Sequence, residues 1–174
     1  MAVRKIRRQS GVANFKSQVN ANDITVDSAT DELKFGTGAS GSSARIVPKN
    51  VVLMFNLNAN ASLADQAIFI ANRAYQVKTI SEVHSTAGSD AGAVNLQVTK
   101  DTATDAPGAG TDLLTNNTNA GFDLKGNANT VQNGALTATA AALLLAAGDR
   151  LSLDFSGVLT ALVGLVITIE LEPV

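Results

Sequence analysis

The stretch "RLSLDFSGVLTALVGLVITIEL", residues 150–171, decides the fold class of this 174-residue chain. Apolar and polar residues alternate from Leu151 to Phe155 and again from Val163 to Leu171. A period of two places the apolar side chains on one face, which is typical of a half-buried β-strand. We therefore expect the chain to end in a long antiparallel hairpin. Four inward-facing side chains should be cross-strand neighbours in it: Leu153, Phe155, Ile167 and Ile169.

The segments before this hairpin carry the same β signal between clusters of turn residues. The run "QAIFIA", residues 66–71, is interpreted as a strand, because its β-branched and aromatic residues outweigh a possible helix start. In "YQVKTISEV", residues 75–83, one face holds Tyr75, Val77 and Thr79, and a change of parity at Ile80 predicts a β-bulge. The run "AVNLQVT" alternates cleanly, with three inward-facing residues: Val94, Leu96 and Val98.

Helical signals are few. The stretch "TATAAALLLAAGD", residues 137–149, is compatible with a helix, but Gly148 and Asp149 end it, so we expect a turn or short helix that leads into a strand. The polar segment 100–134 should form loops with short strands near 122–124 and 130–132. Roughly seven to nine short strands with almost no helix predict an all-β fold, an antiparallel β-sandwich that is jelly-roll-like.

The N-terminal quarter of the chain differs in composition, and the sequence predicts four regions. Residues 1–22 form a basic arm, residues 23–36 a small β-hairpin, residues 37–44 a Gly/Ser linker and residues 45–174 the β-sandwich body. The hairpin rests on two short alternating runs in "DITVDSATDELKF". Because an isolated hairpin is marginally stable in water, we expect this one to pack on another subunit or on the body.

The linker contains the pattern G-x-G-x-x-G in "FGTGASGSS", residues 35–43. A dinucleotide-binding loop needs a helix after this pattern and an acidic residue about 20 positions later. The following segment has no helical period and contains Pro48, and no acidic residue lies between Glu32 and Asp65. A P-loop would need lysine where Ser42 stands. We interpret the segment as a flexible linker and expect no nucleotide cofactor.

Charge is divided unevenly along the chain. The first 16 residues carry no acidic residue, and the rest of the chain carries 15 acidic residues against the other eight basic ones. We interpret this as a basic arm that binds a partner on a predominantly acidic chain; the alternative is a solvated terminus. Nucleic-acid binding is disfavoured by the acidic body and the lack of an aromatic stacking face. The arm's basic residues are Arg4, Lys5, Arg7, Arg8 and Lys16.

Composition excludes some chemistry. The absence of cysteine excludes disulfides, thiolate metal ligands and cysteine nucleophiles. The longest apolar run, residues 159–167, is too short to span a bilayer, so no membrane partner is expected. No apolar region follows the charged N-terminus, so we expect synthesis in a cytoplasm without a secretory signal.

Two segments resemble structural proteins of tailed bacteriophages. They are "FIANRAYQVKTISEVHSTAGSDAGAVNLQVTKD", residues 69–101, and "LLAAGDRLSLDFSGVLTALVGLVITIEL", residues 144–171. Their motifs are an N-R-x-Y turn at Asn72–Tyr75 and an A-G-D-R sequence at Ala147–Arg150. Among such proteins, the segments look like the head decoration, or cement, proteins of the jelly-roll type. The resemblance implies a homotrimer on the outer capsid surface of the virion of a phage, with the arm residues 1–22 binding the major capsid protein.

Catalytic, cofactor and metal sites are not expected, and we do not expect an enzyme. His84 is the sole histidine and has no evident triad or metal partners. Asp149 and Asp154 could suggest the paired carboxylates of a glycosidase. Asp154, however, lies at an outward position of its strand, and Asp149 lies in a turn, so both are explained by their structural positions. The acidic residues of "SDAGA" and "DTATDAPGAGTD" could bind calcium weakly but are interpreted as solvated loop residues.

One rival function stays open. A phage tail-fibre or receptor-binding head domain that recognises a host glycan would also suit a sandwich fold. Sugar sites usually present exposed aromatic rings, however, and this chain has no Trp, one Tyr, and Phe residues mostly at inward positions.

Overall fold

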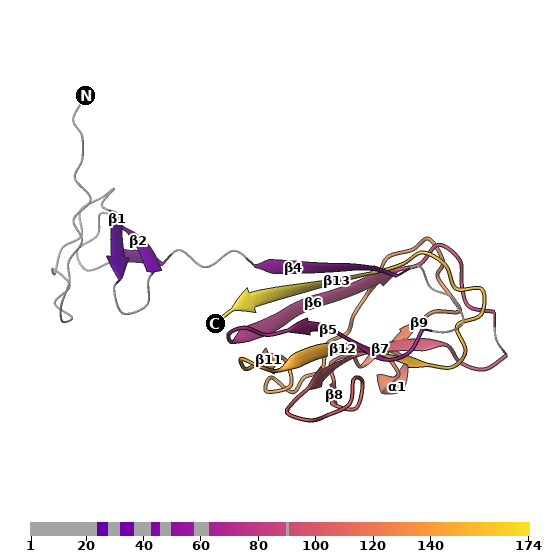
Figure 1. Cartoon of the computed structure of the whole chain (residues 1–174). Coiled ribbons are helices and arrows are strands. Elements are labelled where there is room, and N and C mark those ends of the chain that lie inside the picture. The colour runs from indigo at the N-terminus through magenta and orange to yellow at the C-terminus, as the bar shows by residue number, and fades with distance from the viewer. Residues whose placement is uncertain (1–23, 28–31, 37–42, 46–49, 58–62, 90) are drawn as a thin grey trace. The chain divides into compact units, whose positions relative to one another are not determined.

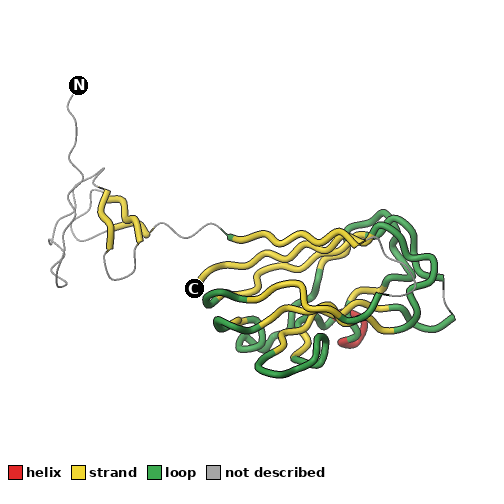
Figure 2. Tube along the Cα trace, in the orientation of Figure 1, coloured by secondary structure: helices red, strands yellow, loops and turns green. Residues whose placement is uncertain are grey.

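A computed structural model describes residues 24–27, 32–36, 43–45, 50–57, 63–89 and 91–174 (Figures 1 and 2). The chain divides into two compact units, Met1–Pro48 and Lys49–Val174. The sequence analysis places the start of the body at residue 45. Side chains are described from Asn50 onward.

The first unit contains three short antiparallel strands in the order β1-β2-β3. Strands β1 (Ile24–Asp27) and β2 (Glu32–Gly36) pair over the residues for which the sequence predicts a hairpin. The third strand, β3 (Ser43–Arg45), pairs with β2 and includes two positions that we had assigned to the linker. The basic arm and residues 37–42 of the linker lie outside the described residues.

The second unit is a sandwich of two antiparallel sheets. One sheet has the order β10-β6-β13-β4, with β11 also paired to β6, and the other has the order β5-β12-β7-β8, with β9 also paired to β7. The strands are β4 (Val51–Leu57), β5 (Gln66–Ile70), β6 (Tyr75–Val83), β7 (Asn95–Asp101), β8 (Thr111–Asp112), β9 (Phe122–Asp123), β10 (Gln132–Asn133), β11 (Leu144–Leu145), β12 (Arg150–Ser156) and β13 (Leu165–Pro173).

The pairing follows the order of a jelly roll. The first strand of the body, β4, pairs with the last, β13, and the second, β5, pairs with β12. The next two, β6 and β7, pair with the short middle strands β10–β11 and β8–β9. The second unit is therefore a long double-stranded ribbon rolled onto itself, which confirms the predicted all-β, jelly-roll-like sandwich.

The core lies between the two sheets. Val94, Leu96 and Val98 are fully buried, as the alternation in that segment predicts. The inward residues of β13 are equally buried, because β13 has a ladder neighbour on each side. Those residues are Leu165, Ile167, Ile169 and Leu171.

The predicted C-terminal hairpin is wrong. Strand β12 pairs with β5 and β7, whereas β13 pairs with β4 and β6, so the two consecutive strands lie in opposite sheets. Leu153 and Ile167 belong to one core cluster but come from different sheets. The connection between β12 and β13 crosses from one sheet to the other, because in a rolled ribbon the last two strands pair with the first two strands rather than with each other. Val163, which we expected to face inward, is 49% exposed.

The predicted bulge is present in β6, but it begins earlier than expected. Glu170 of β13 opposes Thr79 and Leu171 opposes Val77, so Lys78 is the extra residue. Thr79 is consequently exposed, not inward-facing, and burial resumes at Ile80.

The helix-compatible stretch 137–149 contains turns and the short strand β11, which agrees with the turn alternative. The one helical element in the described part of the chain is α1 (Asn116–Asn119), drawn red in Figure 2. Asn117, Thr118 and Asn119 have positive φ, so this segment is a left-handed turn rather than a regular α-helix.

Candidate functional site

The proposed binding residues and the body fall in different parts of the chain. Arg4, Lys5, Arg7, Arg8 and Lys16 lie outside the described residues, so the structure does not place them. The body offers three features that bear on function: a buried polar layer, a buried Glu–His pair and an apolar edge strand.

The polar layer covers the outward face of β7 and β12. Its residues are buried although their parity points them away from the core: Gln97, Thr99, Asp101 and Ser152. The Asp101 carboxylate accepts hydrogen bonds from Thr99 Oγ1 at 2.8 Å, from Ser152 Oγ, and from the backbone N–H groups of Gly108 and Gly110 at 3.3 and 3.1 Å. Asp101 is thus the anchor of the loop 102–110. Our expectation that it is a solvated loop residue is wrong.

Gln97 fixes a second loop over the same face. Its Oε1 accepts hydrogen bonds from the N–H groups of Val98 and Leu114, and its Nε2 donates to the carbonyls of Leu114 and Asn119, all at 2.9 to 3.0 Å. The Gln97 amide therefore accepts from the N–H of Leu114 and donates to its carbonyl, as the backbone of a neighbouring strand would. All four hydrogen-bonding positions of this buried side chain are used for structure.

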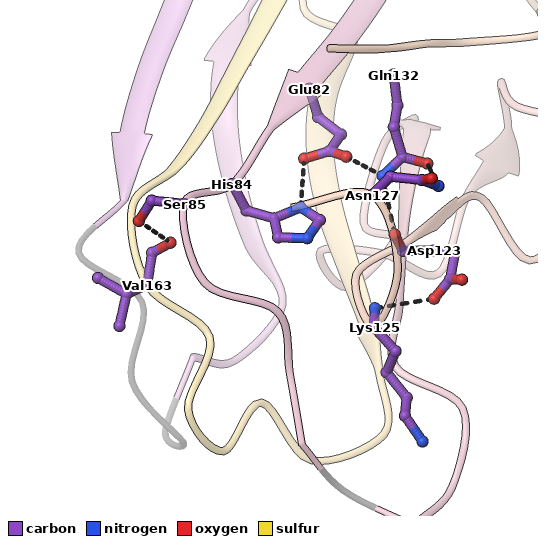
Figure 3. Close-up of polar contacts among 8 residues, drawn as sticks. All are labelled: Glu82, His84, Ser85, Asp123, Lys125, Asn127, Gln132 and Val163. Atoms are coloured by element: carbon purple, nitrogen blue, oxygen red, sulfur yellow. Dashed lines mark hydrogen bonds and ion pairs between the residues drawn. The ribbon is translucent and has the colours of Figure 1, made fainter. Parts of the chain in front are cut away.

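The buried pair is formed by Glu82 at the end of β6 and His84 just after it. Nδ1 of His84 lies 3.2 Å from Glu82 Oε2, and both side chains are fully buried. Figure 3 shows Gln132 on the other side of the carboxylate, where its Nε2 donates to Glu82 Oε1 and, at 2.8 Å, to the carbonyl of Asp123. The network ties β6 to strands β9 and β10.

Burial raises the pKa of Glu82, and the nearby Asp123 carboxylate adds to the rise, whereas the hydrogen bond and charge of His84 and the hydrogen bond of Gln132 oppose it. His84 Nε2 is buried with no hydrogen-bond partner among the described residues. With a proton on Nδ1 the imidazole donates a hydrogen bond to Glu82, and Nε2 stays without a partner among the described residues. The sequence analysis missed this pair. Alternation counted from Ile80 would have shown it, because Glu82 and His84 lie two and four residues further on and therefore share the inward face of Ile80.

The two aspartates considered as catalytic carboxylates differ in role. Asp149 Oδ2 accepts the N–H of Ala146 at 2.8 Å, so it stabilises a turn, as predicted. Asp154 is half-buried rather than fully exposed, and its pKa is raised by burial and by the carboxylates of Asp65, Asp112 and Asp101. Among the described residues, no group of three or more acidic or histidine side chains is arranged to hold a metal ion.

Two shallow depressions flank the left-handed turn. The larger, about 660 Å³, is lined by small residues together with Asn95, Asn117, Asp123 and Lys125. The smaller, about 340 Å³, is lined by three threonines with Gly110, Asp112, Leu114 and Asn119. Neither lining includes an aromatic ring, so neither has the stacking face on which sugar recognition usually depends.

The apolar edge is strand β4. Val52 and Met54 on its outer face are 61% and 71% exposed, respectively. The strand lies at the end of its sheet, and among the described residues it pairs with β13 alone. An exposed apolar strand at a sheet edge is a surface on which another chain can pair.

No helix in the described part of the chain is long and apolar enough to cross a bilayer. Comparisons of the chain with models of protein families, with curated proteins and with solved structures found no match.

Proposed function

We propose that the protein is a virion structural protein that decorates the outer surface of a phage capsid and stabilises the shell by binding the major capsid protein. In this proposal the basic arm contacts the capsid and the jelly roll stands as a rigid module on it. The protein is made in the host cytoplasm and joins the virion as a homotrimer.

The observation that carries the proposal is the division of charge along the chain. Five basic residues and no acidic residue occupy the first 16 positions, and the body, residues 49–174, has 11 acidic residues against six basic ones. A basic segment on an acidic module suits docking on an acidic protein surface, because complementary charge speeds encounter and fixes register. The resemblance of residues 69–101 and 144–171 to phage decoration proteins supports the choice of a capsid.

Buried hydrogen bonds within the body support the same function. Asp101 and Gln97, its best-connected buried polar side chains, hold loops onto the sheet. Decoration requires a module that stays folded under the strain of a filled shell, and loops held by buried hydrogen bonds resist local opening.

The test uses heads of the phage that encodes the chain, prepared from a strain in which this gene is deleted. Purified full-length protein should bind these heads at saturable stoichiometry, visible by gel densitometry and as density on the shell. A variant with glutamine at Arg4, Lys5, Arg7, Arg8 and Lys16 should bind weakly. A control that exchanges arginine and lysine at those five positions keeps the charge and should bind. Undiminished occupancy of the glutamine variant would contradict the role of the arm.

Position on the virion separates this function from glycan recognition. Labelled protein on the heads supports decoration, whereas label on fibre tips would favour the receptor-binding alternative. The trimer is tested separately by light scattering at micromolar concentration. A monomeric mass with the hairpin 23–36 still resistant to proteolysis would contradict an oligomer that shares the hairpin.

A further inference from the structure

Asn133 ends strand β10 and is followed by Gly134, which makes the only Asn-Gly sequence in the chain. In such a sequence the backbone nitrogen of the glycine can attack the side-chain carbonyl carbon of the asparagine. Ammonia leaves, a five-membered succinimide ring forms, and water then opens the ring to aspartate or isoaspartate. Glycine favours the attack, because it lacks a side chain that would hinder the nitrogen and its backbone is the most flexible.

Packing explains why glycine stands at position 134. A Cβ there would lie 2.6 Å from Cδ2 of Leu114 and 2.9 Å from the carbonyl oxygen of Ile80. A larger residue would therefore push β10 away from its neighbours. The close approach of the chain at this point requires the same glycine that makes Asn133 chemically labile.

The folded chain holds Asn133 and Gly134 in a conformation that prevents ring closure. Asn133 lies opposite Ser81 in an antiparallel ladder, and the N–H of Gly134 donates to the carbonyl of Ile80 at 2.7 Å. The attacking nitrogen is thus occupied, and the extended backbone keeps it away from the side-chain carbonyl carbon. The side chain is held as well, since Asn133 Oδ1 accepts a hydrogen bond from Ser81 Oγ at 3.1 Å. Ring closure therefore requires that β10 first leave β6.

We propose that Asn133 is a modification site of this protein, deamidated through local opening of β10, and that Gln132 controls the rate by holding β10 closed. Nε2 of Gln132 donates to Glu82 Oε1 and to the carbonyl of Asp123, so one side chain joins β10 to both β6 and β9 (Figure 3). Strand β10 has two residues and lies at the end of its sheet, so few backbone hydrogen bonds oppose its opening.

Either product changes the β10–β6 pairing. Isoaspartate places one extra carbon in the backbone, so residue 133 cannot stay opposite Ser81 while the N–H of Gly134 reaches Ile80. Aspartate keeps the backbone but adds a negative charge to a body that is already net acidic. Deamidation therefore hinders reclosure of β10, and loosened molecules accumulate as the protein ages. The reaction involves no residue of the basic arm and does not depend on capsid binding.

Peptide mapping by mass spectrometry, after incubation of the full chain at neutral pH, measures aspartate and isoaspartate at each asparagine. Asn133 should deamidate at least about tenfold faster in urea that unfolds the chain than in buffer, because the open strand permits ring closure. Asn129 is the internal control, since its side chain is exposed but a β-branched threonine follows it and hinders the attack. It should remain largely unmodified in both conditions. Equal rates at Asn133 in the folded and the unfolded chain would overturn the proposal.

A pair of variants tests the role of Gln132. Gln132→Ala removes the hydrogen bonds to β6 and β9 and should speed deamidation of Asn133 in buffer at least about fivefold. Val131→Ala is the matched control, because Val131 is the adjacent residue and is 61% exposed, and it should react at the wild-type rate. Circular dichroism checks that both variants are folded. Equal rates in the two folded variants would contradict the role of Gln132.

Wild type provides a further test that needs no substitution. At urea concentrations below its unfolding transition, the rate at Asn133 should already rise, because local opening of β10 precedes global unfolding. A rate that rises only together with global unfolding would contradict local opening. All these measurements are made without capsids, so they stand or fall apart from the decoration function.

Discussion

Glu82 Oε2 lies 3.2 Å from Nδ1 of His84, and the two side chains are fully buried at the end of one strand. A buried carboxylate is costly in its charged form unless its partners compensate for the loss of water. Here burial prevails over the charge of His84 and the hydrogen bonds of His84 and Gln132, and the pKa of Glu82 is raised from its ordinary value of 4.5. The pair therefore couples the stability of the body to pH.

The first prediction concerns Glu82→Gln. Because the folded state holds the Glu82 proton more tightly than the unfolded chain does, wild-type stability falls as pH rises from 4.5 through the raised pKa. Glutamine does not titrate, so the stability of the variant relative to wild type should increase across that interval and then level off. Urea unfolding at constant ionic strength between pH 4 and 8 measures the difference.

Glu172→Gln is the matched control for this experiment. Glu172 forms a partly exposed ion pair with Lys78 at 3.1 Å, and a pair of that kind contributes little to stability. The stability of the Glu172→Gln variant relative to wild type should change little over the same pH range. A pH-independent difference between Glu82→Gln and wild type would show that the carboxylate does not control this response.

The second prediction is that Asp154→Asn stabilises the body at pH 7. Burial and the nearby carboxylates of Asp65, Asp112 and Asp101 raise the pKa of Asp154 above its ordinary 3.8, so its charged form is unfavourable in the folded state. Stability is lost as pH rises from 3.8 through the raised pKa, and asparagine avoids that loss. The gain should disappear near and below pH 3.8.

Thermal unfolding of Asp154→Asn at pH 7 and at acid pH provides the measurement. Asp149→Asn is the comparison, because Asp149 stabilises a turn through Ala146 and should show no gain. An Asp154→Asn variant no more stable than wild type at pH 7 would mean that the surrounding carboxylates do not disfavour this charge.

The third prediction compares Asp101, which holds the loop 102–110 from the end of β7, with Asp105 within that loop. Asp101→Ala removes an acceptor used by four donors and should cost about 3 kcal/mol, since several of those donors are left buried without a partner. Asp105→Ala removes bonds to Thr102 in an exposed turn and should cost about 1 kcal/mol or less. Denaturant unfolding gives both values. Equal costs would contradict the anchoring role of Asp101.

The sequence predicts the local pattern of this fold well. Alternation at Val94, Leu96 and Val98 identified the buried face of β7, and the parity change in β6 identified a bulge. Both succeed because a strand's period depends on which side faces the core, and that information is local.

The same pattern cannot identify pairing partners. Leu153 and Ile167 were correctly assigned to the core, but alternation is identical for a hairpin and for strands in opposite sheets. Burial of outward-facing polar residues was also unpredictable. Gln97 and Ser152 are buried because loops fold back over their face, and the path of those loops depends on distant hydrogen bonds rather than on any period.

The last prediction compares two glycines that share a backbone conformation but differ in their surroundings. Gly121 and Gly148 have φ of +88° and +94°, so alanine is strained at both. A Cβ at Gly148 would meet nothing within 4 Å, whereas a Cβ at Gly121 would lie 2.0 Å from the carbonyl oxygen of Leu96. Gly148→Ala should therefore cost about 1 kcal/mol, from backbone strain alone.

Gly121→Ala should cost about 3 to 5 kcal/mol, because relieving the overlap requires β9 to move away from β7, where Leu96 pairs with Phe122. The difference between the two free energies of unfolding isolates the close approach of Gly121 to β7. Hydrogen exchange adds a local check, since the N–H of Leu124, bonded to the carbonyl of Val94, should lose protection in Gly121→Ala and keep it in Gly148→Ala. Equal stability of the two variants would mean that β9 does not pack against β7 as closely as the structure shows.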